Sequence, residues 1–386
     1  MDKHEEIICI RIEGGEEEAV ENNQINIRRG EFKQFDIILT DDDDDDNNSI
    51  DDHHYYGSSN HRRISNNNQT SKRIMQEWKI LEKSLPDSIY VRAYEGRIDL
   101  LRAVIIGASG TPYHDGLFFF DIQFPSDYPN KPPKVYYHSF GYRLNPNLYQ
   151  GGLVCLSLIN TWRGTEKENW NPSESTVLQI LLSIQALVLN AEPYFNEAGH
   201  IFGELSTWKK GSLAYYNEDN KYLSTWKKES LAYNEETFVL SCRTMLAVLN
   251  KPPKHFEEFV GQYFRDRAET ILIASKAYID GKVKVGHHIQ IENTASSSFS
   301  STVSGESNKK FQDSMGIIYS KLLLAFIKNG SSLEYYVGDN MDDHLSNNQV
   351  VLPEPDPLFD QIVSVLVGVL YVLLIIFLLV IVPIIV

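Results

Sequence analysis

The residues best suited to chemistry lie between positions 124 and 170 of this 386-residue chain. Cys155 closes a Gly-Leu-Val-Cys run, and Asn147 stands eight residues before it. A thiolate can accept an acyl group as a thioester, which an amine can then attack. A free cysteine, with a pKa of about 8.5, already supplies some thiolate at neutral pH. A positioned amide such as Asn147 can stabilise the resulting oxyanion or support the surrounding loop. The pattern therefore indicates acyl transfer through Cys155.

The other two cysteines are expected to be structural. Cys9 lies far from this region, and Cys242 stands on the apolar face of a predicted helix. Free cysteines are usually buried and inert. Three widely spaced cysteines cannot form a disulfide framework, and no Cys-x-x-Cys pair indicates zinc. A cysteine hydrolase is also disfavoured, because His138 and His200 are accompanied by no hydrolase motif.

Several spaced motifs around Cys155 resemble those of the ubiquitin-conjugating enzymes. The chain has Tyr-Pro-x-x-Pro-Pro at 128–133, Asn-Pro-Asn at 145–147 and Gly-x-Val-Cys-Leu at 152–156. Trp170 and Pro172 fall where the family has its Trp-x-Pro, and the spacing from Asn147 to Cys155 is the family's own. The resemblance covers residues 71–203. It is strongest to the large hybrid conjugating enzymes and the plant phosphate-signalling group, in which Leu-Asn-Pro-Asn replaces the usual tripeptide.

The resemblance implies a reaction and roles for particular residues. Cys155 would accept ubiquitin from the activating enzyme as a thioester, in an ATP-dependent pathway, and ubiquitin would pass to lysines of target proteins. Asn147 would stabilise the oxyanion or support the loop. The residue that gates the incoming lysine would lie between positions 192 and 199, where Asn196 and Glu197 are both candidates. Neither a cofactor nor a metal is expected.

Two departures from the family pattern bear on activity and partners. Asn145 stands where the family usually has His, a position that organises the loop, so this change is compatible with activity. Asn130 stands where many members carry an aromatic residue that docks on RING-type ligases, which weakens the expectation of ordinary ligase engagement. The implied partners are ubiquitin, the activating enzyme, a ubiquitin ligase and target proteins. The alternative is a catalytically weak scaffold that binds ubiquitin or a ligase, against which the presence of Cys155 argues.

The elements that would position these residues form an α+β domain. Apolar residues at helical spacing predict a helix over 73–85, which Pro86 ends. Strand-like runs follow at 89–93, 100–106, 116–124 and 133–138. A helix over 175–190 would begin at a Ser173 cap, and two further helices are predicted over 235–249 and 256–278. This agrees with the ubiquitin-conjugating fold: an N-terminal helix, a four-stranded antiparallel meander and C-terminal helices.

The N-terminal region is acidic and poor in aliphatic residues. The net charge is −16, and eight carboxylates lie between Asp41 and Asp52. A chain of this charge lacks the basic footprint that nucleic acid requires, so nucleic acid is excluded as the main partner. Residues 41–72 predict a disordered linker, with His53, His54 and His61 in solvent. Residues 7–12 and 35–39 predict short strands that need not pair.

The C-terminal tail is apolar. Residues 362–382 contain no charge, and at ~1.5 Å per residue they match the ~30 Å hydrocarbon core of a bilayer. Because four residues follow, we expect a single-pass tail anchor in an endomembrane, with the catalytic domain in the cytosol and membrane proteins among the targets. A tail appended by a gene-model error is the rival explanation.

The predicted divisions are 1–70, largely disordered; 71–235, the conjugating core; 236–285, a helical extension; 286–357, a flexible linker; and 358–386, the transmembrane tail.

Overall fold

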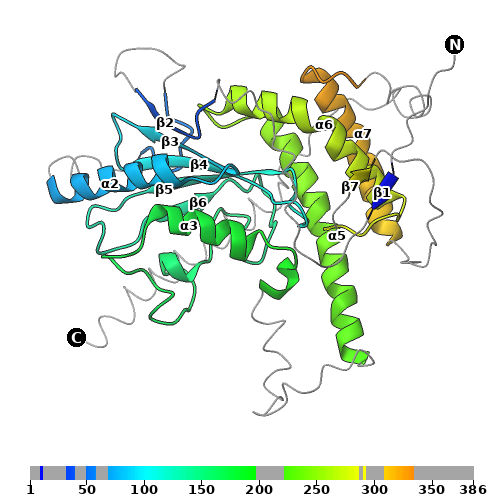
Figure 1. Ribbon diagram of the computed structural model, residues 1–386, viewed down its shortest axis with the longest axis horizontal. Helices are drawn as coiled ribbons and strands as arrows, with labels where there is room; N and C mark the ends of the chain where they lie inside the picture. The colour runs from blue at the N-terminus through cyan, green and yellow to red at the C-terminus, as the bar shows by residue number, and fades with distance from the viewer. Residues whose placement is uncertain are drawn as a thin grey trace, which may run out of the picture. The chain divides into compact units, whose positions relative to one another are not determined.

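The computed structural model describes residues 9–11, 32–39, 49–57, 68–196, 221–286, 290–292 and 308–333 (Figure 1). All of them lie in one compact unit, residues 1–333. The helices are α2 (Asn68–Ser84), α3 (Val177–Ser183), α5 (Lys221–Asn250), α6 (Glu257–Ile279) and α7 (Lys309–Lys328), with short turns η1 (Ser157–Ile159), η2 (Ile184–Val188) and η3 (Pro193–Asn196). The strands are β1 (Cys9–Arg11), β2 (Phe35–Ile38), β3 (Ile89–Tyr94), β4 (Leu100–Ile106), β5 (Leu117–Gln123), β6 (Lys134–Tyr137) and β7 (Gln290–Glu292).

The main sheet has five strands in the order β2-β3-β4-β5-β6. Strands β3 to β6 form the predicted antiparallel meander, with Leu101 opposite Ile122 at its centre. The prediction of four strands was wrong by one, because β2 adds to the edge and runs parallel to β3. The apolar segment at 35–39 is therefore a paired strand. A second sheet joins β1 and β7 in antiparallel fashion.

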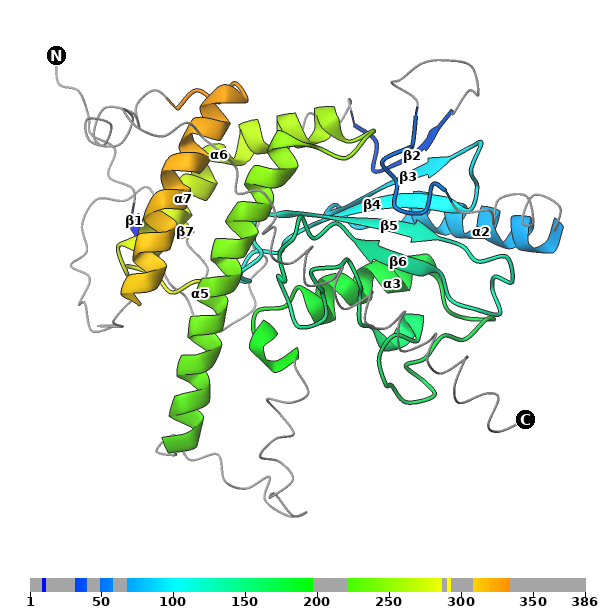
Figure 2. The ribbon, with the colours of Figure 1, turned by 180° about the vertical axis from the view of Figure 1, so that it is seen from behind.

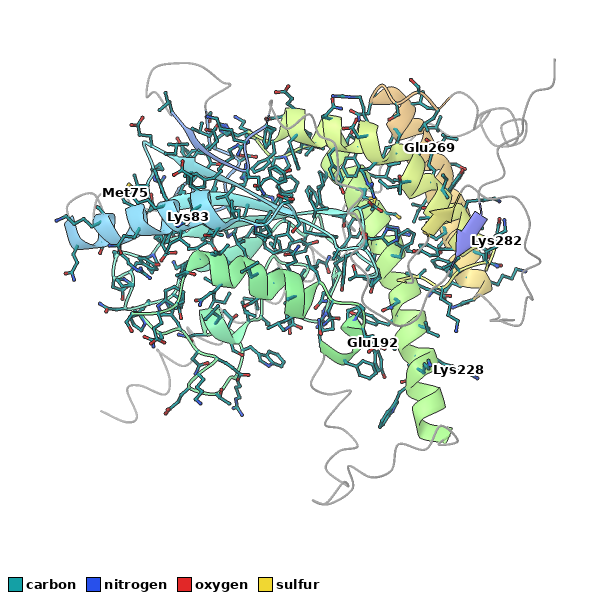
Figure 3. All side chains as sticks on the ribbon, viewed as in Figure 1. Met75, Lys83, Glu192, Lys228, Glu269 and Lys282 are labelled. Atoms are coloured by element: carbon teal, nitrogen blue, oxygen red, sulfur yellow. The ribbon has the colours of Figure 1, made fainter. Side chains whose placement is uncertain are left out.

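One face of the main sheet packs on α2 and α3 to form the hydrophobic core (Figures 1 and 2). From α2, Ile74, Trp78 and Leu81 are buried in it. Met75, labelled in Figure 3, packs against its edge, whereas the labelled Lys83 is exposed. This confirms the amphipathic character predicted for residues 73–85.

Helix α3 begins later than the sequence indicated. Thr176, rather than Ser173, is its cap: its hydroxyl accepts a hydrogen bond from the backbone amide of Gln179, and its own backbone amide donates to Gln179 Oε1. This reciprocal arrangement is a capping box. The helix then widens into the π-helical turn η2. The predicted continuous helix over 175–190 is thus two shorter pieces.

A buried carboxylate ties α2 to the loop ahead of the candidate site. Glu77 is fully buried and accepts hydrogen bonds from the Tyr128 hydroxyl at 2.7 Å and from the Val177 amide at 2.9 Å. Arg73 lies 3.0 Å from the same carboxylate. Because Val177 opens α3, this single side chain joins both core helices to the Tyr-Pro motif.

The opposite face of the sheet is covered by residues 49–57, which we call the strap. Arg102 of β4 is fully buried and donates to both carboxylate oxygens of Asp121, at 2.7 and 3.1 Å, and to Asp52 of the strap at 2.8 Å. His53 exposes 2% of its surface and contacts the carbonyl of Leu101 at 3.0 Å. The predictions of a disordered linker and of a solvated His53 were therefore wrong for the strap. The composition, rich in Asp and His, concealed it, because ion pairs hold it together with a small apolar cluster of Ile50, Tyr94 and Leu100.

Acid is expected to destabilise the fold through His53. Burial lowers the pKa of His53 from 6.5 to about 4, although the charge of Asp121 opposes this shift. The unfolded chain binds the extra proton first, so the stabilisation is complete above pH 6.5 and is lost as the pH falls towards 4. The free energy of unfolding should fall by about 3 kcal/mol from this group at pH 4.

Urea unfolding of the parent and of His53→Gln at pH 7 and pH 4.5 tests this. Both proteins share the other titrating groups, so the parent should lose more stability on acidification than the variant. Equal losses would remove His53 from the acid response.

The C-terminal helices extend the domain and correct two predictions. Helix α5 is continuous across the boundary predicted at 235/236, and α6 agrees closely with the helix predicted over 256–278. Helix α7 packs on α5 and α6, with Met315 and Leu322 fully buried. The prediction of a flexible linker over 286–357 was therefore wrong for residues 309–328. Arg267 of α6 fastens this layer to the sheet by donating from Nε to Asp115 at 2.9 Å.

No helix among the described residues is both long and apolar enough to cross a bilayer. The predicted span at 362–382 lies outside the described residues, as do most of residues 1–31 and His61.

Candidate active site

Cys155 lies on a loop whose start is fastened to the sheet. Leu153 forms a bridge with Tyr136 of β6, and the Tyr137 amide donates to the carbonyl of Gly152 at 2.8 Å. The Cys155 amide donates to the carbonyl of Asn147 at 2.9 Å. Cys155 itself exposes 4% of its surface. An acyl donor must therefore reach the sulfur with a chain end rather than with a folded surface.

Asn147 faces Cys155 across this loop. Its side-chain Nδ2 donates to the backbone carbonyl of Cys155 at 2.9 Å. Within the described part of the chain, its Oδ1 is buried without a hydrogen-bond partner. The side chain therefore supports the loop in this conformation, and it bonds directly to the backbone of the cysteine. An oxyanion role would require Nδ2 to leave the Cys155 carbonyl.

Asn145 organises the same loop from beneath. It is fully buried, and its Nδ2 donates to the Tyr113 hydroxyl at 2.7 Å and to the carbonyl of Val188 at 2.8 Å. Its Oδ1 accepts from the Asn147 amide at 2.8 Å. Both Nδ2 and Oδ1 thus have hydrogen-bond partners. An asparagine is therefore fully bonded at the position where the family usually has His.

Asn196 joins this network, as one of the two gate candidates. Its Nδ2 donates to the Val188 carbonyl at 3.0 Å and lies 3.4 Å from Asn145 Oδ1, while its Oδ1 accepts from Asn190 at 2.8 Å. The structure therefore brings Asn145, Asn147 and Asn196 into one chain of hydrogen bonds. Glu197, the other candidate, lies outside the described residues.

Two contributors were not singled out by the sequence. Tyr113 is fully buried and anchors Asn145, but its segment reads as a turn. Burial raises the pKa of Tyr113 well above its ordinary value, so the hydroxyl stays neutral. Thr161 closes the loop on the far side of Cys155: its hydroxyl donates to the Val154 carbonyl at 2.7 Å and accepts from the Leu156 amide at 2.9 Å. Its spacing of six residues after Cys155 carries no signal in a single sequence.

The Tyr-Pro motif and Trp170 have structural roles. Trp170 exposes 8% of its surface, and its indole Nε1 donates to the carbonyl of Pro129 at 2.6 Å. Its ring lies 5.8 Å from that of Tyr128. Trp170 is thus a packing residue, whereas Trp162 exposes 39% of its surface in the loop that follows the site.

The other cysteines and histidines offer no rival centre among the described side chains. Cys242 is fully buried in α5, and burial together with the charge of Asp115 raises the pKa of this thiol far above its usual range. This confirms the structural reading of Cys242. His138 lies 2.8 Å from Asp121 on the strap side of the sheet. The side chain of Cys9 and all of His200 lie outside the described residues. The described residues also hold no cluster of side chains suited to a metal ion.

Comparison with known proteins places the site in a family. Residues 73–209 match the family model described as ubiquitin-conjugating enzyme. The chain is 54% identical over 215 residues to the Arabidopsis thaliana protein named "Probable ubiquitin-conjugating enzyme E2 23", covering 55% of this chain and 18% of that protein. It is 45% identical over 269 residues to "Probable ubiquitin-conjugating enzyme E2 24" of the same plant, covering 69% of this chain and 26% of that protein.

Two further matches cover less of this chain. The human protein named "Dual E2 ubiquitin-conjugating enzyme/E3 ubiquitin-protein ligase BIRC6" is 48% identical over 137 residues, which is 34% of this chain and 3% of that protein. The solved structure of human ubiquitin-conjugating enzyme E2 G1 is 27% identical and covers 30% of this chain and 89% of its own, with a TM-score of 0.27. The chain spans only a minor part of the plant relatives E2 23 and E2 24. Residues 73–209 are nevertheless a domain of the ubiquitin-conjugating enzyme family, and plant members are among the relatives that they resemble.

Proposed function

We propose that this chain is a ubiquitin-conjugating enzyme that carries ubiquitin as a thioester on Cys155 and transfers it to lysines. The observation that supports this most is the loop that joins the two motif residues: Asn147 Nδ2 donates to the Cys155 carbonyl, and the Cys155 amide donates to the Asn147 carbonyl. Two reciprocal bonds fix the distance between a nucleophile and an amide donor. Such positioning is what acyl transfer at a thiol requires.

The proposed reaction has two steps. First, the Cys155 thiolate attacks the ubiquitin thioester on the activating enzyme, and that enzyme's thiol leaves. Second, a lysine amine attacks the carbonyl carbon of the Cys155 thioester, the C–S bond breaks, and an amide forms as the amine loses its proton. Asn147 would turn towards the oxyanion of the second step, and its buried, unpartnered Oδ1 indicates that its present orientation is not fully satisfied within the described residues.

Thr161 and Asn145 would keep the loop rigid during both steps. Thr161 binds the backbone on either side of Cys155, and Asn145 fixes the amide of Asn147. Asn196 would stand at the entry of the lysine, because it belongs to the same hydrogen-bonded chain as Asn145 and Asn147; Glu197 is the alternative. The partners of the proposed reaction are ubiquitin, the activating enzyme, a ligase and the target proteins.

Incubation with activating enzyme, ubiquitin and ATP tests the assignment. The chain should gain the mass of one ubiquitin in a bond that thiol reductant cleaves. A chain that binds ubiquitin without such an adduct would instead be the scaffold considered above. An adduct on another residue would overturn the assignment to Cys155.

We also propose that the C-terminal tail holds the enzyme in a membrane. The support is compositional: residues 362–382 are uncharged and long enough for one helical span. The reaction needs ubiquitin that the activating enzyme has charged at the expense of ATP. The catalytic domain would therefore face the cytosol and modify membrane proteins there.

Removal of residues 358–386 is therefore expected to convert a membrane protein into a soluble one. Full-length chain should stay in the membrane pellet after a carbonate wash, since an apolar span resists extraction, whereas the truncated chain should be soluble and still form the thioester. Cell fractionation and the charging assay measure both properties. Full-length chain in the soluble fraction would contradict the anchor.

A further inference from the structure

The strap contacts an aromatic ring beside the Cys155 loop. His54 stacks on Tyr136 of β6, with ring centroids 3.6 Å apart and an angle of 4° between the planes. The backbone amide of His54 donates to Asp121 at 2.8 Å, which fixes this residue above the sheet. The His54 ring also meets that of Tyr55 at 83°, with centroids 4.7 Å apart, so the described contacts of the imidazole are with aromatic rings while the hydrogen bond uses the backbone.

Tyr136 in turn supports the start of the Cys155 loop. It forms the bridge to Leu153, and its ring lies so close to Gly152 that a β-carbon there would collide with it. Gly152 also has a φ of +85°, a conformation that favours glycine. Since Gly152 precedes Cys155 by three residues, the place of the Tyr136 ring sets where this loop leaves the sheet.

The other end of the strap is anchored by charge. Asp52 binds the buried Arg102 at 2.8 Å and accepts a hydrogen bond from the Lys254 amide at 3.0 Å. Lys254 Nζ pairs with Asp51 at 2.8 Å, and His255 contacts the Ser49 carbonyl at 3.2 Å. Thus the connection between α5 and α6 holds the strap against the sheet. Only the Arg102 side chain is buried among these ionic contacts, and Lys254 and Asp51 are partly exposed, so the contacts specify one arrangement more than they add net stability.

From these contacts we infer that the strap positions the Cys155 loop, with His54 acting through Tyr136 as a positioning residue. This inference rests on the proposed function. His54 reaches the loop only through the tyrosine ring, so it takes no part in bond making. It limits the freedom of Tyr136 and therefore of Gly152 and Leu153. A loop that moves by a fraction of an ångström misplaces the nucleophile, and acyl transfer is sensitive to such displacement.

Loss of the His54 ring is expected to slow transfer. An aromatic contact of this kind corresponds to a factor of about 3 to 10 in an equilibrium constant, and its loss would lower the fraction of chains whose loop holds Cys155 ready for attack by up to that factor. The first-order rate constant for discharge of the Cys155 thioester to free lysine should fall by that factor in His54→Ala. The lysine concentration that gives half the maximal rate should stay the same, because the strap does not contact the amine.

Two variants separate positioning from folding. His54→Phe keeps a flat ring for Tyr136 and should restore the rate constant to within about twofold of the parent. Tyr56→Ala removes an exposed ring from the same strap, without a described contact to Tyr136, and should leave the rate constant unchanged. A first-order rate constant does not depend on the fraction of chain that is folded, whereas the amount of thioester does.

The measurement is a single-turnover discharge of preformed thioester in the full chain, followed by non-reducing electrophoresis. Slow discharge in His54→Ala with recovery in His54→Phe supports the inference. Equal rate constants in His54→Ala and the parent, or equally slow discharge in both His54 variants, would overturn it. Failure of the parent itself to form a thioester would instead refute the proposed function.

Discussion

Cys155→Ala is expected to abolish the ubiquitin adduct, and Cys155→Ser to trap it. Alanine offers no nucleophile, so incubation with activating enzyme, ubiquitin and ATP should give no mass increase. Serine should give an oxyester, which resists thiol reductant and reacts with amines more slowly than a thioester. Electrophoresis with and without reductant distinguishes the parent, whose adduct disappears, from the serine variant, whose adduct remains.

Cys242→Ala is the matched control for this pair. The Cys242 thiol is fully buried in α5, and its raised pKa keeps it protonated, so its removal should leave the adduct in place. Loss of the adduct in a folded Cys242→Ala variant, or its persistence in Cys155→Ala, would show that the nucleophile has been placed on the wrong cysteine.

Asn147→Ala should load ubiquitin but discharge it slowly. The side chain donates to the Cys155 carbonyl, and its proposed oxyanion role belongs to the attack by lysine more than to the exchange between two thiols. If it behaves like other oxyanion donors, its loss should reduce the discharge rate constant by about 10²–10³-fold. Pulse–chase discharge to free lysine measures this rate separately from loading.

Asn130→Ala is the matched control, because it makes the same substitution at an exposed position. Because free lysine needs no ligase, this variant should discharge at the rate of the parent. Discharge of Asn147→Ala at the parental rate would remove Asn147 from the mechanism. Loss of loading together with discharge would assign it to the support of the loop alone.

The sequence predicted the elements that depend on local pattern. The run at 100–106 matches β4 residue for residue, and the run at 133–138 contains β6 with one extra residue at each end. Runs of strand-forming residues bounded by turn residues mark such strands whatever packs on them. Helix α7 also carried a usable signal, since its buried Phe311, Met315, Ile318 and Leu322 recur at helical spacing. The neighbouring serine-rich stretch obscured it.

Features held by distant polar contacts could not be predicted in this way. The strap contains few aliphatic residues, and its burial depends on Arg102 and Lys254, which lie 50 and 202 residues from Asp52. Strand β2 pairs in parallel with β3, which also lies far from it in the sequence. No local pattern records such partners, so low apolar content was read as disorder. Ionic contacts with a buried partner can specify the position of a segment that has too few apolar residues to be placed by the hydrophobic effect alone.

The candidate site was predictable in its motifs but not in its supports. Cys155 and Asn147 were placed by the spacing of the motif residues, and the structure joins them by two hydrogen bonds. Asn145 was noted as a departure, yet its bonds to Tyr113 and Val188 depend on the tertiary fold. Tyr113 lies in a turn, and Thr161 in a loop, where residue type alone does not distinguish a supporting side chain from an ordinary one.

The central claim is that Cys155 both accepts ubiquitin and passes it to an amine. It is tested most directly by a pulse–chase with the parent chain: the thioester is formed, ATP is removed to stop further charging, and free lysine is added at increasing concentration. The account predicts that lysine accelerates the loss of thioester and that ubiquitin–lysine accumulates in equal amount. Loss of thioester at a rate independent of lysine, with only free ubiquitin as product, would contradict it.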